Sequence, residues 1–365
     1  MILARGLTLI SATILLTEPM AAQSRHEIRS QPSCEDCSIE ISHLLTLGEE
    51  DGPGAIADVV GVARDSRGRS YVWQSIVPHE ILVFERGGRF LDVIGREGEG
   101  PGEYKSLGLV HVAMGDTLYL FDPGNTRITV LSPSWELVRT TLVTGIVRGA
   151  VEVGNGTMVV NARINTPDRI GLPLHLVNRD GEILRSFGAE EAVYRPGSPW
   201  LSMRSITSGG ENAVWAAHRT QYVVERWNTN AAKLGEFIRV ADWFPPRLTQ
   251  TSITPNDPPQ PELQAIRRDS RGLLWVAVSV ADEDWKRALG PRKNTPEGPM
   301  YFWSAMEEMF DTIIEVIDPT EGRLLVSQRL PQFFFRFLDD NHIAGLHTDS
   351  LDVPYIDVYR VRLRE

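Results

Sequence analysis

The sequence contains few cysteines and no concentrated run of basic residues. Only two Cys occur in 365 residues, and 37 Lys and Arg stand against 48 Asp and Glu, which gives a formal net charge of −11. Binding to nucleic acid or to an anionic membrane surface requires a basic footprint. The acidic balance excludes those partners and leaves a protein, a peptide or an anionic small molecule as the expected ligand.

Long apolar runs are also missing. Beyond the N-terminus, no apolar run approaches the ~18 residues that a spanning helix needs. Residues 6–17 form a short apolar run that follows Arg5, and a polar break and small residues come after it. This order is typical of a cleaved secretory signal. We expect residues 1–23 to be a signal peptide, cut near Ala22 or Gln23, and the mature chain to be exported, periplasmic or extracellular, without a transmembrane segment. An uncleaved anchor is the alternative.

Familiar catalytic motifs are absent as well. The sequence contains no GxSxG, no GxxxxGK[ST], no HExxH and no DxDxDG pattern. The serine-hydrolase, nucleotide, zinc-protease and calcium-loop chemistries therefore lose their usual sequence support. No catalytic residue is assigned from the sequence.

The two cysteines lie close together, at Cys34 and Cys37. In an oxidising compartment such an isolated pair favours a local disulfide. A redox or metal-binding pair is the alternative, but a strand-like alternation follows at residues 38–42 and no second ligand pair accompanies it. Since the loop is short, we expect the bond to order a lead-in at residues 24–38 and to add little stability.

Short β-rich runs recur in groups of four, separated by Gly, Asp, Asn and Pro. The first unit reads Ile56–Arg64, Arg69–Gln74, His79–Glu85 and Arg89–Ile94. The pentapeptide that begins at Arg64 (RDSRG) returns letter for letter at Arg268, each time followed by an aromatic residue and Val. The separation of the two copies along the chain corresponds to four units of about 51 residues each, and a unit of this length is close to the size of a propeller blade.

The last unit, which begins at Phe334, contains only three strands before the chain ends. Ile39–Leu47 stands alone before the first unit and runs into Gly, acidic residues and Gly-Pro-Gly, as the fourth strand of the first unit also does. This orphan strand is therefore predicted to pair with Tyr355–Leu363 and to complete the last blade. Residues 39–365 then form an all-β, six-bladed β-propeller whose closure leaves no long exposed edge.

The GEGPGE-type turn, the CxxC after the signal and the six units resemble the bacterial exported six-bladed β-propeller proteins, which have NHL-like repeats. The resemblance implies a fold and not a function, because propellers of this architecture include binding modules, hydrolases and lyases.

Loop lengths separate the two faces of the predicted disc. First-to-second and third-to-fourth turns are short, whereas every long connection belongs to the other two classes and lies on the opposite face. The long connections are Gly95–Lys105, Arg163–Leu172, Gly188–Met203, Ala241–Glu262 and the fifth-unit insertion Asp282–Asp311. Within the insertion, Pro299–Phe310 is predicted to form a short helix, either as a cap on the blade or as a lid. Since long loops are often functional, this face is the expected site.

Candidate ligand residues follow from that placement. A weak candidate metal site, for a divalent ion such as zinc, comprises three histidines that would converge on the channel mouth: His79, His111 and His218. The alternative is that these histidines are scattered and bind no metal. Arginines near the first strands could bind a carboxylate or phosphate, unless loop acids pair with them. The ligand-binding candidates are Arg96, Tyr104, His111, Arg148, Trp200, Arg204 and His218, with Arg336 as a further first-strand arginine.

The sequence thus predicts a monomeric exported binding module without a required cofactor. A propeller hydrolase or lyase with a metal or an Arg/His site at the channel mouth is the alternative.

Overall fold

The computed structural model describes residues 24–28, 31–74, 79–142, 145–154, 156–188, 203–247, 254–295, 298–303 and 305–365. The predicted signal peptide and Trp200 lie outside the described residues.

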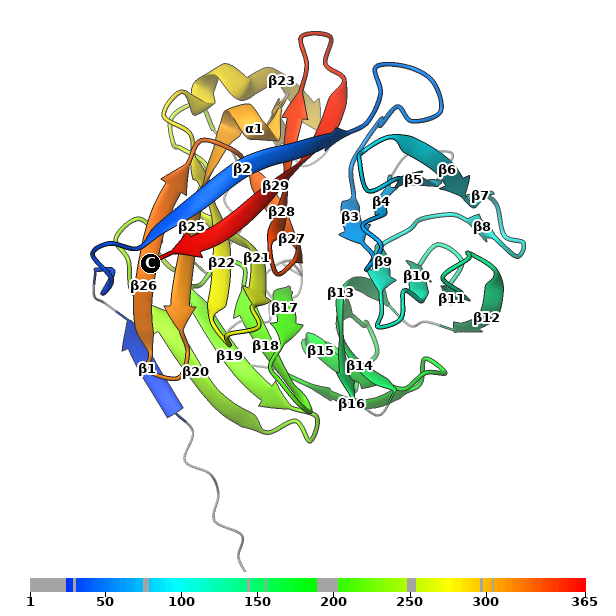
Figure 1. The fold of residues 1–365 in the computed structure, drawn as a ribbon, viewed down its shortest axis with the longest axis horizontal. Coiled ribbons are helices and arrows are strands. Elements are labelled where there is room, and N and C mark those ends of the chain that lie inside the picture. Colours follow the sequence, from blue (N-terminus) through cyan, green and yellow to red (C-terminus); the bar gives the residue numbers. More distant parts are fainter. Residues whose placement is uncertain are drawn as a thin grey trace, which may run out of the picture.

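Six sheets of four or five strands, formed by the described residues, are arranged in a ring (Figure 1). Each sheet is one blade, numbered I to VI along the chain. Blade I contains β3 (Gly61–Arg64), β4 (Ser70–Trp73), β5 (Ile81–Phe84) and β6 (Phe90–Ile94). Blade II contains β9 (Leu109–Val112), β10 (Leu118–Asp122), β11 (Arg127–Leu131) and β12 (Leu137–Leu142). Blade III contains β13 (Ile146–Gly154), β14 (Thr157–Arg163), β15 (Leu174–Val177) and β16 (Ile183–Phe187).

The second half repeats this order. Blade IV contains β17 (Arg204–Ser208), β18 (Ala213–His218), β19 (Val223–Asn228) and β20 (Lys233–Arg239). Blade V contains β21 (Glu262–Arg268), β22 (Leu274–Ala281), β25 (Phe310–Asp318) and β26 (Arg323–Leu330). Blade VI contains β27 (Phe334–Asp339), β28 (His342–Thr348), β29 (Pro354–Arg364) and, from the other end of the chain, β2 (Ser38–Leu47). The six-bladed propeller is therefore confirmed.

Burial follows the position of a strand within its blade. Every residue of β4, β5 and β18 is buried, because neighbouring blades cover both faces of these middle strands. Outer strands such as β12 alternate between half-buried and exposed residues. The middle strands therefore read as continuous apolar runs, and the outer ones do not.

The ring closes as the sequence predicts. β2 pairs antiparallel with β29, from Ser38 opposite Arg364 to Leu47 opposite Ile356 (Figure 1). The innermost strands β3, β9, β13, β17, β21 and β27 contact one another in cyclic order, including β27 with β3. The first and last blades are thus neighbours, and no blade edge is left open at the seam.

The repeated RDSRG segments are turn clamps. The Asp65 carboxylate accepts hydrogen bonds from the backbone N–H groups of Arg67 and Arg69 and from the Tyr71 hydroxyl. Asp269 does the same in blade V, where Trp275 Nε1 donates to it at 3.0 Å. The aromatic residue at a fixed offset is therefore the partner of the turn aspartate as well as a buried core residue.

A strand that the sequence did not reveal precedes the cysteines. β1 (Ser24–Ile28) pairs in parallel with β20 and adds a fifth strand to blade IV. Farther along, the backbone N–H of Ser33 donates to the Leu324 carbonyl on β26 at 2.9 Å. Residues 24–28 and 31–37, the N-terminal strap, thus cross the outer edges of blades IV and V before β2 enters blade VI.

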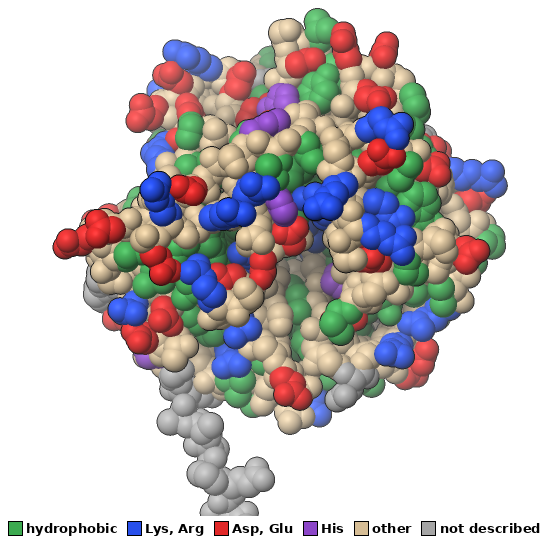
Figure 2. Space-filling model, viewed as in Figure 1, with side chains coloured by type: hydrophobic (Ala, Val, Ile, Leu, Met, Phe, Trp, Pro, Cys, Tyr) green, Lys and Arg blue, Asp and Glu red, His purple; other side chains and the backbone are tan. Residues whose placement is uncertain are grey.

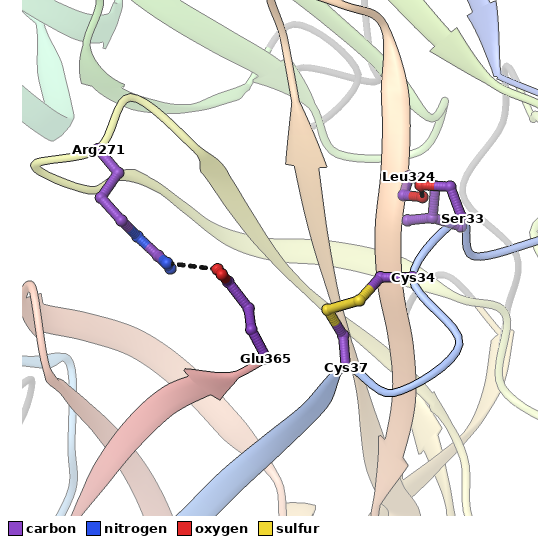
Figure 3. Close-up of a disulfide and its surroundings, with 6 residues drawn as sticks. All are labelled: Ser33, Cys34, Cys37, Arg271, Leu324 and Glu365. Carbon is purple, nitrogen blue, oxygen red and sulfur yellow. Dashed lines mark hydrogen bonds and ion pairs between the residues drawn. A yellow bond between two sulfur atoms is a disulfide. The ribbon is translucent and has the colours of Figure 1, made fainter.

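Cys34 and Cys37 form the predicted disulfide at the end of the strap (Figure 3). Cys37 packs on the apolar cluster between blades V and VI. The C-terminal Glu365 lies nearby and pairs with Arg271 at 2.8 Å.

We expect the disulfide to contribute modestly. Because it closes a very short loop, replacing both cysteines by serine should lower the free energy of unfolding by about 2 kcal/mol. Thermal unfolding of this variant, compared with the reduced and oxidised wild type, measures the effect. A loss several times larger would show that the bond holds the whole strap in place.

The insertion of blade V corrects one prediction. Residues 298–303 form β24 (Gly298–Trp303), which pairs with β23 (Leu289–Thr295), so most of Pro299–Phe310 is not helical. Among the described residues of the insertion, the helical ones are the short α1 (Met306–Met309) and the 3-10 turn η2 (Trp285–Ala288). The run of large and aromatic residues has high β-propensity, and an adjacent segment is available as its partner.

The insertion packs against the propeller through its base. Trp285, Ala288 and Met309 are buried against Phe310 and Phe333. This contact corresponds to the expected cap on blades V and VI.

Candidate functional site

The long connections emerge together on one face of the ring. They join β6 to β9, β14 to β15, β16 to β17, β20 to β21 and β22 to β25, whereas the connections at the opposite ends of the strands are short. Figure 2 shows the molecule hollowed near its centre, with basic, acidic and histidine side chains around the hollow. The charged side chains at which this face meets the inner strands are therefore the first candidates for a ligand-binding site.

Two arginines there bind one carboxylate, and a third arginine lies near one of them. Glu262, at the start of β21, accepts a hydrogen bond from Arg219 Nε at 2.7 Å and another from Arg247 Nη2 at 2.7 Å. Arg148, on β13, is exposed and lies close enough to Arg219 for that like charge to act on it. We call Arg148, Arg219, Arg247 and Glu262 the arginine cluster.

Backbone hydrogen bonds hold the cluster together. The N–H of Leu263 donates to the carbonyl of Arg219 at 2.9 Å, and the N–H of Arg247 donates to the carbonyl of Thr220 at 3.1 Å. Arg219 and Arg247 come from two different connections of the long-loop face, so these contacts join the connections beside β21. The guanidinium groups are therefore positioned by the fold before any ligand arrives.

The cluster carries an excess of positive charge in an acidic protein. One carboxylate neutralises part of three guanidinium charges, and Arg148 has no ion pair within the described residues. Arg148 is exposed as a whole residue, but its guanidinium group is partly desolvated; this desolvation and, after it, the charge of the neighbouring Arg219 lower its pKa. A bound anion would relieve this repulsion through charge-assisted hydrogen bonds, which Arg forms well with carboxylate and phosphate.

Arg204 and His218 do not belong to this cluster. They lie opposite each other on β17 and β18, and both are buried inside blade IV. His218 Nε2 lies 3.2 Å from the Glu225 carboxylate, which also accepts a hydrogen bond from Lys233 at 2.9 Å. The sequence placed them at the channel mouth, but this buried carboxylate on the next strand draws them into the blade.

Burial gives two histidines a role in acid stability. Burial lowers the pKa of His175 to about 4, and burial with the nearby Arg204 charge lowers that of His218 to about 4. An unfolded histidine titrates near 6.5, so the unfolded chain binds these protons first. Each neutral histidine therefore contributes its full stabilisation above pH 6.5. As the pH falls toward 4, the free energy of unfolding decreases by up to about 3 kcal/mol for each of the two residues.

We therefore expect the free energy of unfolding to fall steeply between pH 6.5 and 4. His175, whose Nδ1 lies 2.8 Å from Ser186 Oγ, is the residue to replace. In the variant His175→Gln, the slope of the unfolding free energy against pH should decrease by the equivalent of about one proton. Urea unfolding at several pH values measures this slope. A slope identical to that of the wild type would contradict this assignment.

His111 lies on an inner strand, as predicted. It is half-buried on β9, with its ring 6.4 Å from that of Tyr119. Burial and the charge of Arg336 on β27 lower its pKa to about 4. It is therefore a neutral imidazole at physiological pH.

The three candidate metal ligands do not come together. His218 is enclosed in blade IV, and His79 lies in the connection before β5 with a positive φ of 56°. Among the residues that the structure describes, no three His, Cys, Asp or Glu side chains are arranged to hold a metal ion.

Arg96 and Tyr104 are used within the connection from blade I to blade II. Arg96 starts β7 (Arg96–Glu97), which pairs with β8 (Glu103–Tyr104), and it forms an ion pair with Glu103 at 2.7 Å. Tyr104 is fully buried, in the space that a side chain at Gly95 would need. Gly95 has a φ of +83°, so only this residue type fits the turn without strain.

Of the sequence candidates, the structure thus leaves Arg148 exposed and places His111 and Arg336 half-buried on inner strands. Sequence reasoning missed Arg219, Arg247 and Glu262, since it collected basic residues at first strands alone. A survey of arginines in the second-to-third and fourth-to-first connections would have found Arg219 and Arg247.

Comparisons with known proteins agree with this architecture. Residues 58–143 match the sequence family described as a 6-bladed beta-propeller. The structure is similar to that of a Bacteroides fragilis protein that is described as an exported protein. The TM-score is 0.58, and the two chains are 12% identical over 93% of this chain and 100% of that one. It is also similar to a member of the DUF4221 family from Bacteroides vulgatus, with a TM-score of 0.60 and 9% identity over 90% and 99%.

A comparison with curated protein sequences finds no match. At these identities the structural likeness shows the fold alone. The resemblance to the bacterial exported six-bladed propellers is confirmed.

Proposed function

We propose that this chain, a six-bladed β-propeller of the exported bacterial kind, is a binding module that holds an anionic ligand at the arginine cluster. The observation that carries the proposal is that Arg219 and Arg247 meet on Glu262 while Arg148, without an ion pair among the described residues, lies near Arg219. Long connections on a closed β scaffold can form the walls of a binding site over a central hollow. The local field of such a site guides anions to it despite the net negative charge.

Export is part of the proposal. The predicted signal peptide, the Cys34–Cys37 disulfide and the exported relative from Bacteroides fragilis support it. No helix among the described residues is long and apolar enough to cross a membrane. Detection of the mature protein in a periplasmic or culture-supernatant fraction, with a new N-terminus near Gln23, would test this.

Calorimetric titration with the peptide tetraglutamate tests the ligand class. We expect tetraglutamate to bind and tetraglutamine not to bind, with an affinity that falls as salt is added. Arg148→Gln should weaken binding at least ~10-fold, which corresponds to one lost charge-assisted contact.

Arg89→Gln is the matched control, because Arg89 is exposed and pairs with Glu85 at a short turn of blade I. It should bind as the wild type does. Equal affinity for the two peptides, or equal losses in the two variants, would contradict the proposal.

A further inference from the structure

A second basic site lies on the innermost strands at the seam between blade VI and blade I. Its central residue, Arg336 on β27 of blade VI, is half-buried. Its guanidinium carbon lies 5.5 Å from the centre of the Trp73 ring in blade I. Arg336 therefore bridges the seam between the last blade and the first.

A glycine makes this reach possible. Gly61 on β3 lies opposite Trp73 on β4, and a Cβ atom at position 61 would come within 2.3 Å of the indole ring. The ring thus occupies the space of the missing side chain, against the innermost strand. A guanidinium group arriving from blade VI can meet it there.

The charge of Arg336 has no counter-ion among the residues that the structure describes. Within the described part of the chain no carboxylate forms an ion pair with it, and burial alone lowers its pKa to about 10. Its positive charge also acts on His111 of blade II, on the far side of blade I. A half-buried cation that acts on blades I and II without a counter-ion among the described residues is unusual, because buried charges are normally paired.

Two polar groups beside Arg336 are also left without partners. His111 Nε2 and Trp73 Nε1 are buried and form no hydrogen bond within the described residues. A neutral imidazole and an indole can each donate one hydrogen bond. Among the described residues, the site therefore combines one full positive charge with two neutral groups and no acid.

We propose that Arg336, His111 and Trp73 form a binding site for a monocarboxylate group in the channel wall, separate from the arginine cluster. The planar guanidinium matches a carboxylate, which can accept two parallel hydrogen bonds from it. One negative charge neutralises Arg336, whereas a dianion such as hydrogen phosphate would leave an excess charge in a partly desolvated wall. The site therefore selects carboxylate over phosphate.

Fluorine NMR with trifluoroacetate tests the site, since this probe stays ionised throughout the titration range of histidine. Trifluoroacetate should show a saturable shift with the wild-type protein, and the neutral isostere trifluoroacetamide should show none. Arg336→Gln should weaken binding at least ~10-fold, Arg336→Lys less, and the exposed control Arg89→Gln not at all. Loss in Arg148→Gln with no change in Arg336→Gln would overturn this site and leave the arginine cluster as the anion site.

The wild-type protein supplies a readout that does not depend on a variant's stability. A bound carboxylate would neutralise Arg336, so saturating trifluoroacetate should raise the pKa of His111 in a proton NMR titration while that of His175 stays unchanged. The proposal fails if the His111 titration does not respond, or if inorganic phosphate displaces the probe at a lower concentration than acetate does.

Discussion

A chain that begins at Gly48 should lose at least ~10 °C in melting temperature, or fail to fold cooperatively. The truncation removes β2, whose Ile39 and Leu47 are buried, and leaves the edge of β29 unpaired. Each lost buried aliphatic side chain costs roughly 2–5 kcal/mol. A total of ~7 kcal/mol corresponds to a shift of this size in a protein of this length.

A second truncation separates closure from the strap. A chain that begins at Gln31 keeps β2 and the disulfide but lacks β1, so it should lose much less than the chain that begins at Gly48. Circular dichroism melts of the two proteins and of the mature chain measure the difference. Closure by β2 is refuted if the shorter chain melts within about 2 °C of the mature protein, well below the shift that the lost burial implies.

Replacing Glu315 by leucine should destabilise the protein by about 3–5 kcal/mol. Glu315 on β25 is fully buried and pairs with Arg239 of β20 at 3.1 Å. It also accepts a hydrogen bond from the Tyr222 hydroxyl at 2.8 Å. Removing one partner of such a pair leaves an uncompensated buried charge.

The double variant Glu315→Leu with Arg239→Met is the control. An apolar pair of similar volume often replaces a buried ion pair at little cost, so the double variant should recover much of the lost stability. Arg239 also donates to the Ile28 carbonyl at 3.2 Å, and the attachment of β1 should remain weakened. Urea unfolding of the single and double variants tests this, and a single variant within about 1 kcal/mol of the wild type would contradict it.

The fold could be predicted because its signals are local and repeated. The RDSRG copies, the Gly-Pro-Gly segments and the orphan strand at Ile39–Leu47 establish the blade phase without knowledge of distant contacts. β1 escaped prediction because a short strand that pairs in parallel with a remote edge strand leaves no turn or hairpin signal beside it. The insertion was misread because a short run of large apolar residues suits either a helix or a strand.

The site could be predicted only in part, because neighbours across blades decide it. Arg148 and Arg204 have similar positions near the start of a first strand, yet Arg148 is exposed and Arg204 is buried beside His218. The difference arises from Glu225, a buried carboxylate on a strand farther out in blade IV. Nothing in the spacing of these residues shows that this acid faces inward, so the sequence cannot separate the two arginines.

The central claim is that the arginine cluster binds anions, and a crystal soaked in selenate tests it most directly. Selenate is a dianion, and anomalous scattering from its selenium atom locates it without assumption. The account predicts an anomalous peak within hydrogen-bond distance of Arg148 and Arg219, and its disappearance in crystals of Arg148→Gln grown and soaked in the same way. An adventitious peak elsewhere with none at the cluster, or an unchanged peak in the variant, would contradict it.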